Sequence, residues 1–329
     1  MEYTHLGRTG LRVSRLCLGT MNFGPRTSEP DSHGVMDRAL ELGLNFFDTA
    51  NTYGQERGEG VTEKILGTWF AQGGGRRDQV VLATKVYGIM GDGPNDRGLS
   101  ARHIIAQCEA SLKRLQTDYI DLYQMHHVDR ATPWEEIWQA MDLLVVQGKI
   151  RYVGSSNFAG WHLAAIQEAA NRRHSLGVVS EQCVYNLLRR QVELEVLPAA
   201  QAYGMGIIPW SPLHGGALSG ALRKIAEGSA VRSSSGPSAA DAVEHNRAQL
   251  EAWEKFCAEL GEPPAHVALA WLLAQPAVTA PIIGPRTVAQ VDDSAACLDV
   301  ELDDEVRSRL DELFPPVGKG GPGPEAWAW

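Results

Sequence analysis

Residues 46–54 read FFDTANTYG, in which an apolar run ends on a carboxylate, Asp48, and a phenol, Tyr53, follows five residues later. Two later apolar runs end in the same manner, because VLATKV carries Lys85 and DLYQMHH carries His126. In a parallel barrel the carboxyl ends of all strands open onto one face, so residues far apart in sequence converge there. An acid, an ammonium group, a phenol and an imidazole on one face predict chemistry at a carbonyl group.

Strand-like runs alternate with helical patterns through most of the chain. Short, continuously apolar runs are typical of buried parallel strands. The eight expected strands are residues 16–19, 45–49, 80–86, 119–125, 150–154, 178–184, 206–209 and 280–283. Helices are expected at residues 100–115, with Ser100 as the N-cap, and at residues 133–147. The pattern predicts an α/β fold, a (β/α)8 TIM barrel that forms one domain over residues 1–329.

The segments outside this alternation have their own signatures. Residues 2–6 and 11–13, turned by Gly7 and Gly10, predict an N-terminal β-hairpin. Irregular stretches long enough to act as lids are expected on the C-terminal face of the barrel. They cover residues 26–32, 87–98 and 213–242, and a Pro/Gly-rich tail follows at residues 315–329.

A dinucleotide-binding fold is the rival α/β architecture. Its G-x-G-x-x-G fingerprint joins a strand to a helix. The match in this chain, at Gly318, Gly320 and Gly323, lies in the tail, where no strand precedes it and no helix pattern follows. The barrel is therefore preferred.

Composition limits the partners that this chain can have. Its 329 residues carry a net charge of −10, which argues against nucleic acid and against anionic membranes. The N-terminus lacks an apolar leader, and the five cysteines include no C-x-x-C, so a cytoplasmic protein with reduced thiols is expected. The histidines show no metal-ligand spacing, and no metal is expected.

The quoted motifs also occur together in a known order. LGTMNFG, FFDTANTYG, ATK, DLYQMHHVD, VGSSNF, SEQCVYN, IPWSPL and IIGPRT follow one another along the chain. In these stretches the sequence resembles the aldo-keto reductase superfamily from Leu6 to about Cys297. GLSARHI, VGSSNFAGWH and WSPLHGG make it most similar to a bacterial branch that includes reductases of nucleotide-linked deoxysugars.

The resemblance implies an enzyme that transfers hydride from NADPH to an aldehyde or ketone. Tyr53 would protonate the carbonyl oxygen, and the positive charge of Lys85 would make that phenol a stronger acid. Asp48 would pair with Lys85, and His126 would orient the carbonyl. His127 is the alternative to His126, but strand alternation places the two on opposite faces, and the family register favours His126.

The resemblance also implies a set of cofactor contacts. Ser156, Asn157 and Gln182 match the groups that bind the carboxamide, and Trp210 matches the ring on which nicotinamide stacks. Ser211, Leu213 and Gly215 match the pyrophosphate loop, and Gly284, Arg286 and Gln290 match the segment around the adenosine phosphate. Arg286 favours NADPH over NADH because a guanidinium suits a 2′-phosphate. Ser294 stands where the family usually has an asparagine against adenine.

Substrate identity is not fixed by these motifs. Met21, Tyr87 and His127 are expected in the wall of the substrate pocket, against a small-molecule carbonyl compound. Two alternatives stay open: reduction of the 2,3-enoyl bond of a nucleotide-linked 4-keto-6-deoxyhexose, and a cofactor-binding regulatory subunit. The chain is expected as a monomer or a homo-oligomer.

Overall fold

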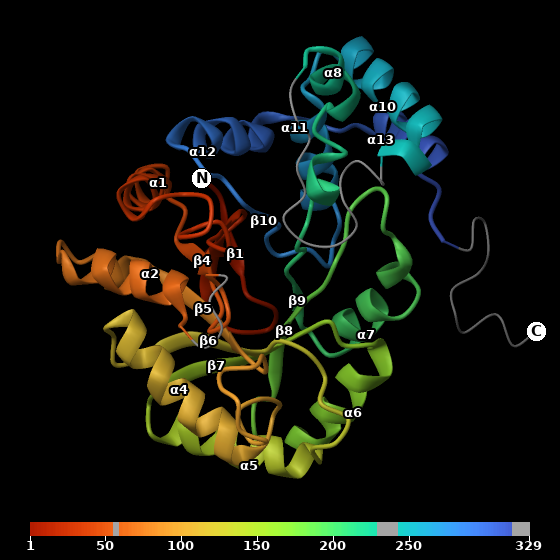
Figure 1. Ribbon diagram of the computed structural model, residues 1–329. Coiled ribbons are helices and arrows are strands. Elements are labelled where there is room, and N and C mark those ends of the chain that lie inside the picture. The colour runs from red at the N-terminus through yellow and green to blue at the C-terminus, as the bar shows by residue number, and fades with distance from the viewer. Residues whose placement is uncertain (55–58, 229–242, 318–329) are drawn as a thin grey trace, which may run out of the picture.

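Eight parallel strands form the centre of the protein, seen in a computed structural model that describes residues 1–54, 59–228 and 243–317 (Figure 1). Their order in the sheet is β10-β3-β4-β5-β6-β7-β8-β9. The strands are β3 (Cys17–Gly19), β4 (Phe46–Asp48), β5 (Val81–Val86), β6 (Ile120–Met125), β7 (Ile150–Ser156), β8 (Val178–Gln182), β9 (Gly206–Ile207) and β10 (Ile282–Ile283). The Ile282 amide donates to the Pro209 carbonyl over 2.8 Å, which joins the two edges of the sheet. The predicted (β/α)8 barrel is confirmed.

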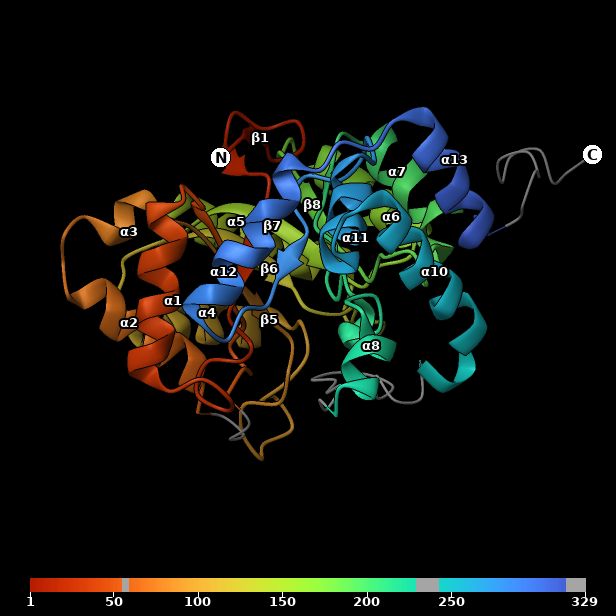
Figure 2. The same cartoon turned by 90° about the horizontal axis from the view of Figure 1, so that it is seen from above.

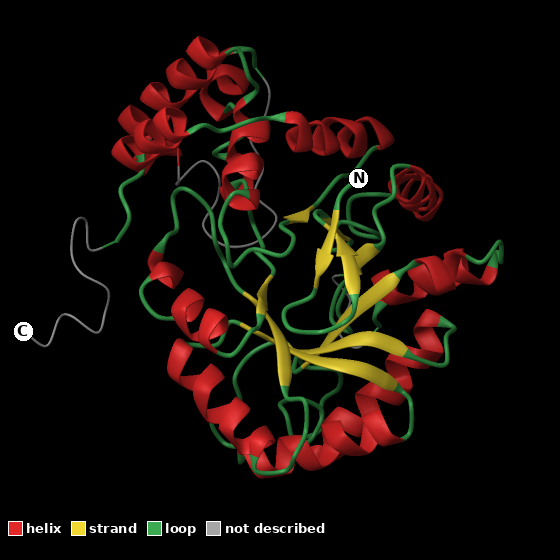
Figure 3. Ribbon diagram, turned by 180° about the vertical axis from the view of Figure 1, so that it is seen from behind, coloured by secondary structure: helices red, strands yellow, loops and turns green. Residues whose placement is uncertain are grey.

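Helices surround the strands, as Figure 3 shows in red around yellow. The α-helices are α1 (Glu29–Glu41), α2 (Val61–Ala71), α3 (Arg76–Gln79), α4 (Ala101–Leu115), α5 (Trp134–Val146), α6 (Gly160–Asn171), α7 (Val196–Ala202), α8 (Ala221–Ala226), α10 (Arg247–Leu260), α11 (Pro264–Leu273), α12 (Val288–Ala295) and α13 (Asp304–Leu313). Short 3-10 turns lie at η1 (Gln191–Glu193), η2 (His214–Gly216) and η3 (Ala296–Asp299). Ser100 caps α4 as predicted, because its hydroxyl accepts the His103 amide.

The predicted hairpin, β1 (Tyr3–His5) and β2 (Arg12–Ser14), is also present. It lies at one end of the strands, while α8 and the long loop after β5 lie at the other (Figure 2). Arg15 anchors it by donating to the backbone carbonyls of Val278, at 2.7 Å, and Thr279, at 3.0 Å. The hairpin therefore closes the amino end of the barrel and leaves the carboxyl end for a site.

Two of the expected irregular segments contain helix. α1 begins at Glu29, inside the expected loop 26–32, because Ser28 provides an N-cap and Pro30 occupies the first turn. α8 lies inside the expected loop 213–242, of which residues 229–242 are outside the described residues. Most of the predicted tail, from residue 318 onward, is outside them as well.

β8 carries an extra residue. Val153 of β7 pairs with Val178, but the next residue, Gly154, pairs with Ser180, so Val179 has no partner of its own in β7. Such a bulge shifts the alternation of side chains beyond it by one. It decides which way the last residues of β8 point at the carboxyl end.

A substitution at Gly67 in α2 would test how closely α2 packs against α4 in the outer layer of helices. A Cβ there would lie 2.1 Å from the carbonyl oxygen of Arg114 in α4. Helix propensity alone would make Gly67→Ala stabilising by about 1 kcal/mol, whereas overpacking costs about 1–3 kcal/mol or more. We expect the clash to dominate and the melting temperature to fall. Gly10→Ala, where a Cβ meets nothing within 4 Å, is the control; a Gly67→Ala protein at least as stable as wild type would contradict the packing.

Candidate active site

Lys85 lies at the centre of the carboxyl end of the barrel and is fully buried. Its ammonium group is 2.5 Å from Asp48 Oδ1, the last residue of β4. It also donates to the Thr49 carbonyl, at 2.9 Å, and to the Tyr53 hydroxyl, at 3.2 Å. An ammonium group has three N–H donors, so every one of them has an acceptor.

The charges of this cluster shift the titration of its members. Burial opposes the charge of Lys85, but the negative charge of Asp48 and the contact with Tyr53 together raise the pKa of Lys85 above its usual value. Burial raises the pKa of Tyr53 and outweighs Lys85, whose charge lowers it. Lys85 thus acts on the pKa of Tyr53 in the direction expected of its charge, but burial is the larger effect and the net pKa is raised. The phenol keeps its proton at neutral pH.

His126 follows directly after β6 and lies beside Tyr53. The two rings are 6.0 Å apart between centroids and meet edge to face. Burial, then the charge of Lys85, holds the pKa of His126 well below its usual value, so the imidazole is neutral at neutral pH. A neutral imidazole still offers one N–H donor.

His127 does not lie on the opposite face from His126, so that expectation was wrong. The two rings stack at 5.1 Å with an interplanar angle of 10°. Strand alternation ends with β6 at Met125, and the backbone beyond it is no longer extended in the sheet. Tyr87 packs edge to face on His127 at 5.4 Å, which places two of the expected substrate residues together. The third, Met21, is half-buried in the loop after β3.

The second oxygen of Asp48 is held by two side-chain amides. Gln182 donates to Asp48 Oδ2 over 2.8 Å and Gln124 over 3.0 Å. Gln124 was missed by the sequence analysis. It stands two residues before His126 in an otherwise apolar strand, and a buried amide at that spacing is the signal that could have revealed it.

The residues expected around the nicotinamide form one hydrogen-bonded group. Trp210 donates through its indole to Asn157 Oδ1 at 3.0 Å, and Asn157 donates to the backbone carbonyl of His126 at 3.1 Å and to Ser156 at 3.0 Å. Asn157 adopts a left-handed φ of 61°. Its amide is thus already bonded, whereas Gln182 keeps its Oε1 atom without a bond among the described residues. The Ser156 hydroxyl is bonded too, because it donates to the Gln182 carbonyl at 2.8 Å and accepts from Asn157. The Oε1 atom of Gln182 is therefore the acceptor that stays open in this group.

The expected pyrophosphate loop follows Trp210 and is built from left-handed residues. Ser211 has a φ of 54° and Gly215 a φ of 65°, and Leu213 lies between them. The Gly215 amide donates to Ser211 Oγ at 3.2 Å. Turns of this kind present backbone N–H groups to an anion.

The expected adenosine-phosphate segment lies at the start of α12. The Arg286 amide donates to Gln290 Oε1 at 2.8 Å, while the exposed Arg286 guanidinium has no acceptor or counter-ion among the described residues. A free guanidinium at a helix N-terminus fits a phosphate. Gly284 is tied to the neighbouring loop after β3, because Asn22 donates to its carbonyl at 3.0 Å. Ser294 is half-buried farther along α12.

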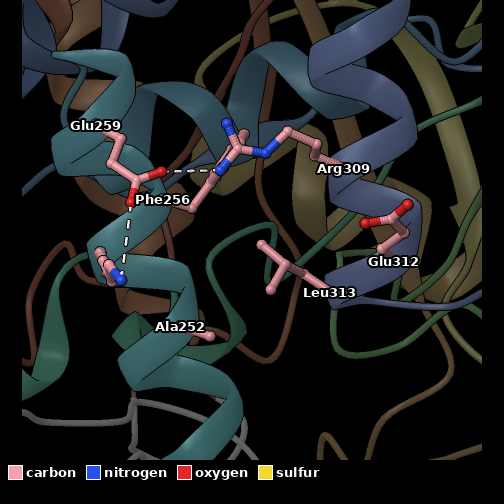
Figure 4. Close-up of a pocket in the computed structure, with 7 residues that line it drawn as sticks. Ala252, Phe256, Glu259, Arg309, Glu312 and Leu313 are labelled. Atoms are coloured by element: carbon pink, nitrogen blue, oxygen red, sulfur yellow. Dashed lines mark hydrogen bonds and ion pairs between the residues drawn. The ribbon is translucent and has the colours of Figure 1, made fainter.

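A separate cavity of about 280 Å³ lies between α10 and α13 (Figure 4). Arg309 lies over the Phe256 ring and pairs with Glu259 at 2.8 Å, so the guanidinium in its wall already has a counter-ion. It contains none of the residues singled out by sequence. Among the described residues no cluster of His, Cys, Asp and Glu could hold a metal, and no helix is long and apolar enough to cross a membrane. All five cysteines are buried free thiols.

The sequence profile of the Aldo/keto reductase family matches residues 15–314. The chain belongs to this family. It is 56% identical, over the full length of both proteins, to the uncharacterized oxidoreductase YrpG of Bacillus subtilis (strain 168). It is 34% identical to the versiconal hemiacetal acetate reductase of Aspergillus parasiticus, over 96% of this chain and 98% of that protein.

A third relative is named as a channel subunit and not as a reductase. A probable voltage-gated potassium channel subunit beta of Oryza sativa subsp. japonica is 35% identical over 91% of this chain and 92% of its own length. Family membership supports an oxidoreductase, as the motifs predicted. The deoxysugar branch has no counterpart among these relatives.

The Lys85–Asp48 pair can be tested without a substrate. In Asp48→Asn the buried ammonium loses its counter-ion, which destabilises the fold by about 3–5 kcal/mol. Burial then lowers the pKa of Lys85 in the folded state, so the unfolded state binds more protons and the stability of the variant rises with pH. We expect its melting temperature to increase between about pH 6 and 9, in contrast to wild type.

The double variant Asp48→Asn/Lys85→Met is the control, because it removes the unpaired charge. It should recover part of the lost stability and lose the pH dependence. A single variant as stable as wild type at every pH would contradict the assigned ion pair.

Proposed function

We propose that this protein is an NADPH-dependent reductase of aldehydes or ketones in which Tyr53 is the general acid. The observation that carries the proposal is the Tyr53 hydroxyl, which keeps its proton and is hydrogen-bonded to the fully paired ammonium of Lys85. Bound NADPH would supply hydride to the carbonyl carbon.

The residues of the chain account for the proton. As the carbonyl carbon gains its new C–H bond, the electron pair of the C=O π bond moves to oxygen and takes the proton of Tyr53. The phenolate that remains is stabilised by Lys85 at 3.2 Å, and solvent returns its proton afterwards. The neutral His126 donates an N–H to the same oxygen and holds it toward Tyr53.

The cofactor residues support the same proposal. Ser156 and Gln182 would hold the carboxamide, Trp210 would stack on the ring, and the loop that contains Gly215 would take the pyrophosphate. Arg286 would take the 2′-phosphate, which favours NADPH over NADH.

Two alternatives remain to be separated from this proposal. Reduction of a conjugated C=C bond in a nucleotide-linked 4-keto-6-deoxyhexose is supported by likeness in sequence to one bacterial branch. A cofactor-binding regulatory subunit is supported by the relatives named as channel subunits. The complete hydrogen-bonded set of Asp48, Tyr53 and Lys85 favours turnover, and the neutral His126 favours the carbonyl as its target.

Tyr53→Phe tests the proposal. The assay follows NADPH consumption with aromatic aldehydes, aliphatic ketones and a nucleotide-linked 4-keto-6-deoxysugar. We expect kcat to fall by about 10²–10⁴-fold, the usual contribution of a general acid, with NADPH affinity unchanged. NADPH deuterated at the transferred position shows which carbon receives hydride. Turnover that survives in the variant would contradict Tyr53 as the acid, and binding without turnover in wild type would favour the regulatory subunit.

Arg286→Gln tests the choice of cofactor. Loss of one charge-assisted hydrogen bond, about 1.5 kcal/mol, should raise the Kd for NADPH about 10-fold. The Kd for NADH should not change, because NADH lacks the 2′-phosphate. Arg12→Gln, an exposed arginine in the hairpin at the other end of the barrel, is the control. Equal weakening of both cofactors would contradict the assignment.

A further inference from the structure

Glu181 is a fully buried carboxyl group in β8, beside Gln182, that the proposed mechanism does not use. Its Oε2 atom is 2.5 Å from Ser155 Oγ, and its Oε1 atom accepts the Phe158 amide at 3.0 Å. No lysine, arginine or histidine of the described residues forms an ion pair with it. Burying a carboxylate without a cation is unfavourable in free energy, because the charge loses its hydration.

Its two partners lie at the two ends of residues 155–158, the 155–158 turn, which comprises the last two residues of β7 and the first two that follow it toward α6. The middle of that turn carries Asn157, whose side chain links the carbonyl of His126 to the indole of Trp210. Asn157 holds this position in a left-handed conformation, which a non-glycine residue keeps only where its surroundings enforce it. Glu181 is the group that ties down both ends.

We propose that Glu181 is a positioning residue that fixes the 155–158 turn for cofactor binding, and that it acts as the neutral carboxylic acid. The inference rests on the proposed function, since the turn carries Ser156 and Asn157, which the family resemblance assigns to the nicotinamide carboxamide.

The neutral form satisfies every bond around the carboxyl. Ser155 Oγ lies within hydrogen-bond distance of two acceptors, Glu181 Oε2 at 2.5 Å and the Ser180 carbonyl at 3.3 Å, but a hydroxyl has one proton. In the neutral form the acid proton of Glu181 would bond to Ser155 Oγ, and Ser155 would donate its own proton to the Ser180 carbonyl. Oε1 remains free to accept the Phe158 amide. Burial raises the pKa of Glu181 to about 8, although Ser155 and the backbone amides lower it.

None of the groups that bond to the Glu181 carboxyl is itself charged, so we assign the pH dependence of the turn to Glu181. Its ladder partner in β9 is Ile207, and the groups that bond to its carboxyl, the Ser155 hydroxyl and the Phe158 amide, are uncharged. Directly after β8, the pKa of the Cys183 thiol is raised, first by burial and then by Glu181. At the start of α6, His162 bonds to the Ala159 amide and Glu195 to the Gly160 amide rather than to Glu181.

Ionisation should therefore loosen the turn. Above about pH 8 the carboxyl becomes a buried anion without a cation, and Ser155 must turn its proton from the Ser180 carbonyl to the carboxylate. Because the folded-state pKa lies above the unfolded one, the folded state binds more protons. Stability then falls as pH rises from the unfolded pKa, about 4.3, through the folded one.

The experiment compares wild type with Glu181→Gln and Glu181→Leu by NADPH titration of tryptophan fluorescence, without substrate. Gln keeps an acceptor for Phe158 and a donor for Ser155, so the variant should bind NADPH like wild type at about pH 7 and keep that affinity at about pH 9. Wild type should weaken over that range. Leu removes both bonds and should raise the Kd about 10-fold at each pH.

A second readout uses the protein without cofactor. The melting temperature of Glu181→Gln minus that of wild type should grow as pH rises, because only wild type has a carboxyl group at position 181 that can ionise. Glu195→Gln, a carboxylate that also accepts an amide at the start of α6, should follow wild type in both readouts.

Each of the other outcomes would overturn one specific part of the proposal. Glu181→Gln as weak as Glu181→Leu would overturn the neutral acid, and Glu181→Leu with wild-type affinity would overturn the positioning role. If Glu181→Leu does not fold, the pH profile of Glu181→Gln still decides, since a profile like that of wild type refutes the proposal. Wild type that binds no NADPH would overturn the proposed function instead, and the melting temperatures would still test the state of Glu181.

Discussion

The ion pair between Lys85 and Asp48 is the contact around which the carboxyl end of the barrel is arranged. Moving two charges out of water is unfavourable unless each finds close partners. Here the ammonium has three acceptors, and the carboxylate takes two amides on its other oxygen. Those partners come from β4, β6, β8 and the loop after β4, so one buried pair fixes the relative positions of several strand ends.

In the proposed function, the same contacts connect proton transfer to cofactor binding. Gln182 bonds to Asp48 with one atom and keeps the other for a ligand, and the bulge at Val179 lets it face the centre while Glu181 faces the turn after β7. Asn157 continues the network to His126 and Trp210. The acid, the imidazole and the aromatic platform thus share one set of hydrogen bonds rather than three separate supports.

Much of the fold and of this site could be predicted from the sequence. Short apolar runs mark the buried strands, and Asp48, Lys85 and His126 are polar residues at or just after the ends of such runs. What could not be predicted depends on three-dimensional balance. The net pKa shift of Tyr53 is a competition between burial and Lys85, and the stacking of His127 on His126 follows from where β6 ends. The direction of the Glu181 side chain could not be predicted, because strict strand alternation without the bulge at Val179 would place it on the wrong face of β8.

The complete coordination of Lys85 also determines which reactions this amine avoids. A carbonyl compound and a lysine in one pocket can condense to an imine, but only the free base has the lone pair that attacks. Lys85 is held as a cation with all three N–H bonds committed, and its side chain has no accessible surface. Acylating or reductive-alkylation reagents should therefore modify lysines such as Lys255, whose side chain is 79% exposed, and spare the one beside the phenol. Under the proposed function, an aldehyde substrate held beside Tyr53 would therefore not condense with Lys85.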